Sequence, residues 1–421
     1  MINKIEALNY RCLRDVAQEL DRFQVLVGPN ASGKTSFLDV IAFLGQIVSD
    51  GLETAIKDRT SNPQDLTWGR AGDRFELAIE AAIPAPIRQK LAKPEWDTIR
   101  YEVAIATAPE LGFAAETVIL STHQAMPHDA ERGQLDIFPP ELVVRPTLLS
   151  GKKVGSRTIV NKVAGSNDNF YSETYPEAGK GWTVTFKLGP RKSALANLPE
   201  DESKFPATTW LKQLLGEGVQ SFMLNSPMIR LASPPGRGPG FKADGSNLPW
   251  VVARLEESEE GKGRLADWVG HVRSALPDLI GIRTVERADD KHRYLMLAYA
   301  NGVEVPSWLA SDGTLRMLAL TLPAYLPDFR GVYLIEEPEN GIHPRAVEPV
   351  LQSLASVYDA QILVASHSPV VLSLVNPREV LCFAKNHEGA SAIIRGSDHP
   401  ALRAWRGETN LGVLFAGGVL S

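Results

Sequence analysis

The chain has 421 residues, of which 44% are hydrophobic and 22% are charged, and its formal net charge at pH 7 is -6. This length allows several conventional domains with a sizeable core, and the composition is that of an ordinary globular protein. A net negative charge argues against a uniformly basic nucleic-acid binder, so any contact with DNA would have to be local.

Neither the cysteines nor the hydropathy of the chain indicate an oxidising or a membrane environment. Cys12 and Cys382 lie far apart in the sequence and form no metal-binding motif or disulfide framework. The N-terminus is charged where a signal peptide needs an apolar core, and no run of about 18 apolar residues occurs. We therefore expect a cytoplasmic protein with no membrane partner.

The first informative element is the stretch Gly28-Pro-Asn-Ala-Ser-Gly-Lys-Thr35, which fits the pattern G-x-x-x-x-G-K-[ST]. The apolar run 23–27 before it predicts a strand. Apolar residues at helical spacing after it predict a helix, namely Phe37, Val40, Ile41, Leu44, Ile47 and Val48. The loop N–H groups and the positive end of this helix would point at one cluster of anionic oxygens. Lys34 would then reach the β- and γ-phosphates of a nucleoside triphosphate, and the Thr35 hydroxyl would hold Mg²⁺.

The middle of the chain predicts insertions into an α/β fold. Short strand-like runs alternate with turns through residues 72–190, which indicates an antiparallel β extension; the runs are 75–79, 101–105, 157–160 and 182–186. Residues 191–317 are expected to form a helical lobe, with apolar stripes at Trp210, Leu211, Leu214 and Leu215 and at Leu265, Trp268 and Val272. Residues 1–71 and 318–421 are expected to form one core lobe, because the motifs near both ends must pack into one sheet.

Two segments carry cations without acidic residues and are the candidates for contact with DNA. Residues 142–167 include Arg145, Lys152, Lys153, Arg157 and Lys162, and residues 223–243 include Arg230, Arg237 and Lys242. Clusters of this kind neutralise phosphates. Charge runs are also common on ordinary solvated faces, so both interpretations stay open.

Two polar motifs follow in the last third of the chain. Ser311-Asp-Gly-Thr-Leu-Arg316 opens a helical stretch that Pro323 should kink or end. Its serine suits a helix N-cap, and a helix N-terminus with a small glycine also suits a γ-phosphate. The apolar run 331–337 ends in Glu336 and Glu337, which a parallel sheet would bring to the edge where phosphates bind. One carboxylate would order the Mg²⁺ hydration shell and the other would deprotonate water, unless the pair only caps the next helix.

The run 361–365 predicts another buried strand, and Ser366-His367-Ser368-Pro369 follows it. A histidine at a strand tip beside the acidic pair would donate a hydrogen bond to the γ-phosphate. A single histidine in such a turn is also common as an ordinary hydrogen-bonded residue, so its role depends on where the fold places it.

In their order and spacing, these motifs resemble the ABC-type ATPases of the RecF and SMC class, and they are most similar to the OLD family and related stand-alone bacterial ATPases. Asn9-Tyr-Arg-Cys12 is similar to the Asn-Phe-Arg-Ser segment of those proteins. The Ser311 motif stands in place of the transporter-type signature Leu-Ser-Gly-Gly-Gln. Glu336-Glu-Pro-Glu-Asn-Gly-Ile-His-Pro344 and Ala365-Ser-His-Ser-Pro369 complete the set. The segment 410–418 also resembles the normal end of such ATPases, so we expect a complete protein.

The resemblance implies a P-loop NTPase core of the ABC-ATPase type that binds ATP and Mg²⁺ and hydrolyses ATP. Lys34 would bind phosphate, Glu337 would activate water and His367 would sense the γ-phosphate. Mg²⁺ would be held by Thr35 and Glu336. The other residues of the nucleotide site would be Gly28, Asn30, Ser32, Gly33 and Ser36, with Arg11 close to the nucleotide. Ser311 and Gly313 would contact the γ-phosphate of the nucleotide bound to a second subunit in a head-to-tail dimer.

One feature departs from the wider ABC pattern, and one residue of that pattern cannot be placed. Glu336 stands where an aspartate usually ends the strand, so the choice between direct and water-mediated contact with Mg²⁺ stays open. The glutamine that joins Mg²⁺ in many ABC proteins has two candidates here, Gln46 and Gln64.

The residues after His367 lack the Asp-x-Asp pair that the TOPRIM nuclease of OLD enzymes needs. The leading hypothesis is therefore an ATP-hydrolysing homodimer, or a higher even oligomer, that switches a separate nuclease or toxin in bacterial anti-phage defence. A RecF-like DNA-binding ATPase in DNA repair or maintenance is the alternative. The altered signature and the β insertion argue against a transporter subunit. A nucleotide-binding scaffold that does not hydrolyse ATP is the fourth hypothesis.

Overall fold

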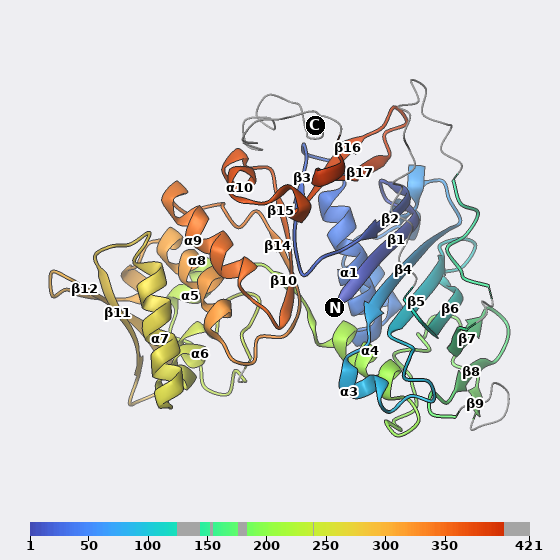
Figure 1. Ribbon diagram of the computed structural model, residues 1–421, viewed down its shortest axis with the longest axis horizontal. Helices are drawn as coiled ribbons and strands as arrows, with labels where there is room; N and C mark the ends of the chain where they lie inside the picture. The colour runs from blue at the N-terminus through green and yellow to red at the C-terminus, as the bar shows by residue number, and fades with distance from the viewer. Residues whose placement is uncertain (124–143, 152–154, 176–182, 239, 400–421) are drawn as a thin grey trace. The chain divides into compact units, whose positions relative to one another are not determined.

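The structure is a computed structural model that describes residues 1–123, 144–151, 155–175, 183–238 and 240–399. The predicted tail 410–418 and the cations Lys152 and Lys153 lie outside these residues. The chain divides into two compact units, which we describe separately (Figure 1). The first unit comprises Met1–Leu20, Thr35–Val219 and Lys385–Ile393, and the second comprises Asp21–Lys34, Gln220–Ala384 and Ile394–Ser421.

The first unit is built on an eight-stranded antiparallel sheet in the order β2-β1-β4-β5-β6-β7-β8-β9. The strands are β1 (Ile2–Tyr10), β2 (Leu13–Glu19), β4 (Arg74–Ala82), β5 (Thr98–Ala106), β6 (Gly112–Ser121), β7 (Arg157–Val163), β8 (Asp168–Tyr171) and β9 (Thr183–Phe186). The helices are α1 (Lys34–Ser49), α2 (Leu52–Lys57), α3 (Ala85–Arg88) and α4 (Pro206–Gly216). Every predicted strand run of the extension overlaps one of these strands.

The start of the sheet differs from the sequence prediction. The extension was expected to begin at residue 72, but β1 pairs with β4 through Ile5 and Ile79, so the N-terminal hairpin is part of the same sheet. This difference concerns the start of the β extension only, and the division into a core lobe, a β extension and a helical lobe stays a prediction.

Helix α1 packs on this sheet through aromatic rings. The Phe43 ring centroid lies 5.9 Å from that of Tyr10 and 5.8 Å from that of Phe75. The apolar positions predicted for this helix are all buried. Gly45 allows a close crossing with α4, because a Cβ at this position would lie 2.7 Å from the Leu215 carbonyl oxygen.

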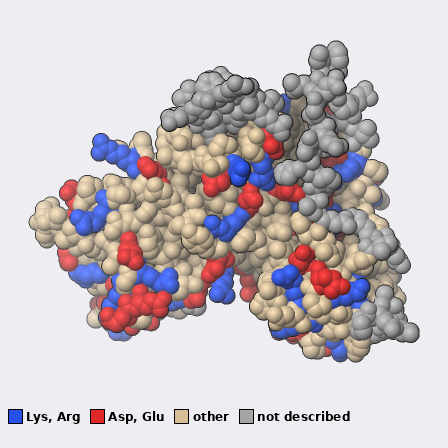
Figure 2. Space-filling model, in the orientation of Figure 1, with Lys and Arg blue, Asp and Glu red and all other residues tan. Residues whose placement is uncertain are grey.

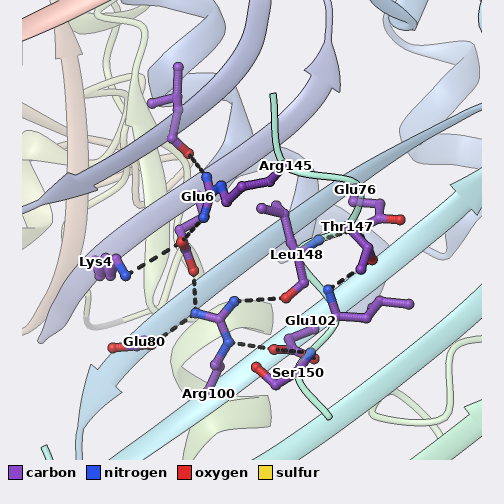
Figure 3. Close-up of polar contacts among 12 residues, drawn as sticks. Lys4, Glu6, Glu76, Glu80, Arg100, Glu102, Arg145, Thr147, Leu148 and Ser150 are labelled. Carbon is purple, nitrogen blue, oxygen red and sulfur yellow. Dashed lines mark hydrogen bonds and ion pairs between the residues drawn. The ribbon is translucent and has the colours of Figure 1, made fainter. Parts of the chain in front are cut away.

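A buried ionic network lies on one face of the sheet (Figure 3). Arg100 of β5 donates to Glu6 of β1, to Glu80 of β4 at 2.8 Å and to Glu102 at 2.5 Å. Burial alone would raise the pKa of Glu6, but the charges of Arg100 and Lys4, together with hydrogen bonds, lower that pKa to about 2. The Glu6 carboxylate is therefore held in its ionised form by the cations around it.

Two acids on this face, Glu76 and Glu102, hold the segment 144–151 across the sheet (Figure 3). The backbone N–H of Leu148 donates to Glu76 at 2.6 Å, and that of Ser150 donates to Glu102 at 2.9 Å. Both carboxylates are almost completely buried. Since buried carboxylates need donors, the segment adds backbone donors to acids that also have arginine partners, Arg74 for Glu76 and Arg100 for Glu102.

The second unit is built on a six-stranded sheet in the order β10-β14-β15-β3-β16-β17. These strands are β10 (Val219–Phe222), β14 (Gly331–Glu336), β15 (Ala360–Ser366), β3 (Phe23–Val27), β16 (Val380–Lys385) and β17 (Ser391–Arg395). The pairs β14–β15, β15–β3 and β3–β16 are parallel. The helices are α5 (Ser226–Arg230), α6 (Leu248–Glu256), α7 (Glu259–Val272), α8 (Asp312–Thr321), α9 (Pro344–Ala355) and α10 (Pro369–Leu374).

A three-stranded antiparallel sheet occupies part of the range that the sequence predicted as helical. Its strands are β11 (Leu279–Glu286), β12 (Arg293–Tyr299) and β13 (Glu304–Pro306). Helices α4 to α7 agree with the prediction, which is wrong over these strands. Leu279 and Ile282 of β11, with Leu295 and Leu297 of β12, are buried in the core that also contains Trp268 of α7. Within the described part of the chain, no helix is long and apolar enough to cross a bilayer.

Replacing Arg100 with alanine should lower the free energy of unfolding by about 3–5 kcal/mol, because Glu6 and Glu102 would stay buried without their main counter-charge. Denaturant unfolding followed by circular dichroism measures this change. Arg283→Ala is the matched control: it removes the exposed Arg283–Glu304 pair, whose atoms lie 2.7 Å apart, and should cost less than about 1 kcal/mol. Equally small losses in both variants would contradict the role of the network.

Candidate functional site

The candidate site lies at the carboxyl ends of three neighbouring parallel strands of the second unit (Figure 1). Val27, the last residue of β3, is in register with Ser366 of β15. Glu336, the last residue of β14, is in register with Ala365. The glycine loop, Glu337 and His367 follow these strands directly. Segments far apart in the sequence therefore meet at one edge of the sheet, where ligands bind in parallel folds.

The glycine loop needs glycine for two different reasons. Gly28 approaches β16 so closely that a Cβ would lie 2.3 Å from the Phe383 carbonyl oxygen. Gly33 has a φ of 108°, a conformation that residues with a Cβ rarely adopt. Between them, Ser32 is buried and Asn30 is exposed. The loop backbone is thus held close to the sheet.

Helix α1 begins at Lys34, so Thr35 and Ser36 lie in its first turn, where backbone N–H groups have no partner within the helix. The Lys34 Nζ donates to the carbonyl oxygens of Gly28 at 2.7 Å and Pro29 at 3.0 Å. Burial lowers the pKa of Lys34, and the opposing effect of the Glu337 and Glu336 charges is smaller.

The acid turn, residues 336–341, follows β14. Glu336 is exposed, whereas Glu337 is partly buried and has a φ of 48°. The Glu337 N–H donates to the Ala365 carbonyl oxygen at 2.7 Å. His367 Nδ1 lies 3.0 Å from one Glu337 carboxylate oxygen, and the Asn340 side chain donates to the other. Left-handed backbone in a non-glycine residue is typical of functional sites, and here both carboxylate oxygens are also held.

Two further residues of the acid turn, Glu339 and Asn340, have no predicted role, although they lie within the motif Glu336–Pro344. Asn340 contacts Glu337 directly. Glu339 accepts a hydrogen bond from the Ser366 hydroxyl at 2.5 Å, and this hydroxyl accepts the N–H of Ser368 at 3.0 Å. The acid turn is therefore tied to the turn that carries His367.

The Ser311 motif lies at the N-terminus of α8, as predicted. The Ser311 hydroxyl accepts the N–H of Thr314 at 3.1 Å, which confirms the N-cap, and Ser311 is exposed. Gly313 packs against the acid turn, because a Cβ there would lie 2.8 Å from the Gly341 carbonyl oxygen. The helix ends before Pro323, which lies in a 3-10 turn.

Arg11 belongs to the first unit. Its guanidinium lies 3.2 Å from Asp39 of α1, and Asp39 also accepts hydrogen bonds from Tyr10 at 2.6 Å and Arg59 at 2.8 Å. The side-chain amide of Gln46 joins this network by accepting from Arg59 at 2.6 Å. The expected place of Arg11 near the nucleotide stays a prediction, as does the choice between Gln46 and Gln64.

The candidate donors for Mg²⁺ are the Glu336 carboxylate and the Thr35 hydroxyl. Among the described residues, no group of three or more His, Cys, Asp and Glu side chains could hold a metal ion. Oxygen ligands suit Mg²⁺, which is commonly bound by one or two protein groups together with phosphates and water. The residue types present fit such a shared site.

Several cations of the two basic segments are engaged within the protein. Arg145 donates to Glu6 at 2.6 Å and to Asp15 at 2.5 Å. Lys162 donates to Asp168 and to the Gly189 carbonyl oxygen, both at 2.9 Å. Arg157 donates to the Tyr175 carbonyl oxygen, and Arg230 donates to Asp312 at 2.7 Å. On the face shown in Figure 2, Lys and Arg side chains lie among Asp and Glu rather than in one stripe. These contacts weaken the interpretation of those side chains as DNA ligands.

Two family models match the chain. Residues 149–373, more than half of the chain, match the family described as "AAA domain, putative AbiEii toxin, Type IV TA system". Residues 1–74 match the family described as "AAA ATPase domain".

Among solved structures, the chain is similar to the SmcHead bound to the C-winged helix domain of ScpA, with 13% identity, a TM-score of 0.51, and coverage of 93% of this chain and 96% of that one. It also matches the Smc head domain with an extended coiled coil bound to the C-terminal domain of ScpA from Pyrococcus furiosus, with 12% identity, a TM-score of 0.49, and coverage of 93% and 95%. The first match shows that the mixed α/β fold is that of an ABC-type SMC head, which confirms the predicted fold class.

Gly28→Ala should weaken ATP binding by at least about tenfold, or roughly 1.4 kcal/mol, because the added methyl group would push the loop away from Phe383. Titration with a fluorescent ATP analogue measures the affinity. Gly302→Ala is the control, since Gly302 also has a positive φ but a Cβ there would meet no atom within 4 Å. Wild-type affinity in the Gly28 variant would contradict the proposed packing of the loop.

Proposed function

This chain belongs to the AAA-domain family with the AbiEii description, and we propose that it is an ATP-hydrolysing dimeric switch that controls a separate effector protein. The observation that supports this proposal most is the alignment of three strand ends in one parallel sheet. These ends are followed by a phosphate-binding loop, an acidic pair and a histidine. This is the set of groups that hydrolysis of a nucleoside triphosphate needs.

Lys34 and the loop would bind the phosphates of ATP. The Lys34 ammonium already has two oxygen acceptors in the loop, at 2.7 and 3.0 Å, so it is close to the loop backbone that would surround the phosphates. Phosphate oxygens would replace or join these acceptors, and the N-terminus of α1 would add its positive dipole. Mg²⁺, held by Thr35 and Glu336, would neutralise charge on the phosphates.

Glu337 would be the general base. Contacts from His367 and Asn340 hold its carboxylate, and its N–H is bound to β15, so its orientation is set from three sides. A carboxylate held in one orientation can accept a proton only from a water molecule in one position, which favours the water that would attack the γ-phosphate. His367 contacts the base through Nδ1, and with both ring nitrogens protonated it would also donate to the γ-phosphate through Nε2. This would link recognition of ATP to the orientation of Glu337.

A homodimer would complete the site, with a higher even oligomer as an extension of the same contact. Ser311 is exposed at a helix N-terminus, a position suited to the γ-phosphate of ATP held by a second copy. Leu309 and Trp308, just before it, are 70% and 41% exposed. Burial of these apolar side chains would favour association of two copies.

The effector would be a separate nuclease or toxin in bacterial anti-phage defence. The support for this setting is the family description, which names the AbiEii toxin and type IV toxin–antitoxin systems. The fold itself is compatible with many functions, so this part of the proposal depends on family analogy.

Lys34→Ala should abolish ATP binding, because the loop would lose its charge contact with the β- and γ-phosphates. Glu337→Gln should bind ATP but release phosphate about 10²–10⁴ times more slowly, because the amide cannot accept the proton of water. Phosphate-release assays and fluorescent-ATP titration separate the two effects. Lys262→Ala, which removes an exposed cation paired with Glu259, is the control and should behave like the wild type.

Unchanged turnover in either site variant would overturn the site assignment. Strong stimulation of turnover by duplex DNA, with steep dependence on salt, would instead favour the RecF-like alternative.

A further inference from the structure

Arg230, the last residue of α5, is bonded to residues on both sides of Ser311. Its Nε and Nη2 donate to one carboxylate oxygen of Asp312 at 2.9 and 2.7 Å. Its Nη1 donates to the carbonyl oxygen of Trp308 at 3.2 Å. The Ser307 hydroxyl in turn donates to the carbonyl oxygen of Arg230 at 3.1 Å. One arginine therefore fixes residues that lie before and after Ser311 in the chain.

Helix α5 is itself held in place, so it can act as a fixed support. Its N-terminus is capped by Asn225, whose side chain accepts the N–H of Met228 at 3.2 Å. Ile229 is fully buried in the core of the unit. From the other side, Arg316 of α8 lies 3.5 Å from the Leu224 carbonyl oxygen just before α5. The two helices are thus connected both at the start of α8 and one turn further along it.

The contact is specific in geometry but should add little to stability. The side chains of Arg230 and Asp312 are 32% and 60% exposed, and exposed ion pairs contribute roughly 0–1 kcal/mol. The planar guanidinium nevertheless uses three donors on two different acceptor groups, which lysine could not reproduce. Between the bonded residues, Ala310 is buried while Leu309 and Ser311 are exposed. Ser311 is therefore exposed to solvent, while contacts of Arg230 with Trp308 and Asp312 fix the chain on both sides of it.

We propose that Arg230 is a positioning residue for the signature segment, residues 307–313, and that it sets where Ser311 meets the nucleotide bound by a second copy of this chain. The inference rests on the proposed function, because it requires an ATP-dependent dimer. It also gives Arg230, a candidate DNA ligand in the sequence analysis, a role inside the ATPase.

The test compares Arg230→Ala and Arg230→Lys with Arg283→Ala, which removes another exposed arginine–carboxylate pair of the same unit. ATP affinity, thermal unfolding and turnover are measured for each purified protein. ATP-dependent dimerisation is measured by light scattering in the Glu337→Gln background, where ATP persists.

Arg230→Ala should leave ATP affinity and unfolding temperature unchanged, because it touches neither the glycine loop nor the core. Dimerisation and kcat should fall by between about tenfold and 100-fold, since a small displacement of a catalytic contact has effects of this size. Arg230→Lys should be intermediate, and Arg283→Ala should match the wild type.

Wild-type dimerisation in Arg230→Ala, or an equal loss in Arg283→Ala, would overturn the positioning role while the proposed function stands. A defect that appears only when DNA is added would also overturn it, and would favour DNA contact. If the unaltered protein neither dimerises with ATP nor turns it over, the proposed function itself fails and the inference fails with it.

Discussion

The parallel pairing of β14, β15 and β3 is the constraint on which the candidate site depends. Its backbone ladder places Glu336 beside Ala365 and Ser366 beside Val27, so the residues that follow all emerge at one edge. The strands themselves are buried apolar runs, and a shift of register by one residue would turn their side chains to the opposite face of the sheet. The same burial that stabilises the sheet therefore also fixes the relative positions of the lysine, the acids and the histidine.

The acid turn connects the two ends of the proposed chemistry within one subunit. On one side Glu337 is bound by His367, and on the other the carbonyl oxygen of Gly341 lies against Gly313 of α8. Movement of α8 would therefore push directly on the turn that carries the base. In a closed dimer, Ser311 would contact the nucleotide of the second subunit, while Glu337 would act on the nucleotide of its own subunit. A shift of α8 caused by the first contact would reach Glu337 through the acid turn, because Gly313 of α8 packs against Gly341 of that turn. Such a link would make ATP hydrolysis sensitive to dimer closure.

The sequence predicted the elements whose signal is local, and it missed those that depend on distant partners. The strand 23–27, the helix after it and the N-cap at Ser311 each follow from neighbouring residues. Strand β1 was not predicted, because Glu6 is a polar residue at a buried position, and its partners Arg100 and Arg145 lie far away in the sequence. The same limit applies to the basic segments: counting charges cannot show that a cation is already paired. Asn340 and Glu339 were missed because their partners come together only in the folded turn.

Arginine–carboxylate contacts serve two different purposes in this protein, and burial decides which. Two of the carboxylates bonded to Arg100, Glu6 and Glu102, are almost completely removed from water, so opposite charges must pair for this part of the sheet to form. Arg230 is bonded to an acid that water also solvates, so its charge is hardly needed for folding. Water could solvate Asp312 but could not fix its position. The three coplanar donors of Arg230 hold Asp312 and the Trp308 carbonyl oxygen in a defined position relative to each other. Removal of the Arg100 side chain should therefore lower the stability of the fold. Removal of the Arg230 side chain should instead change the geometry of the segment that carries Ser311.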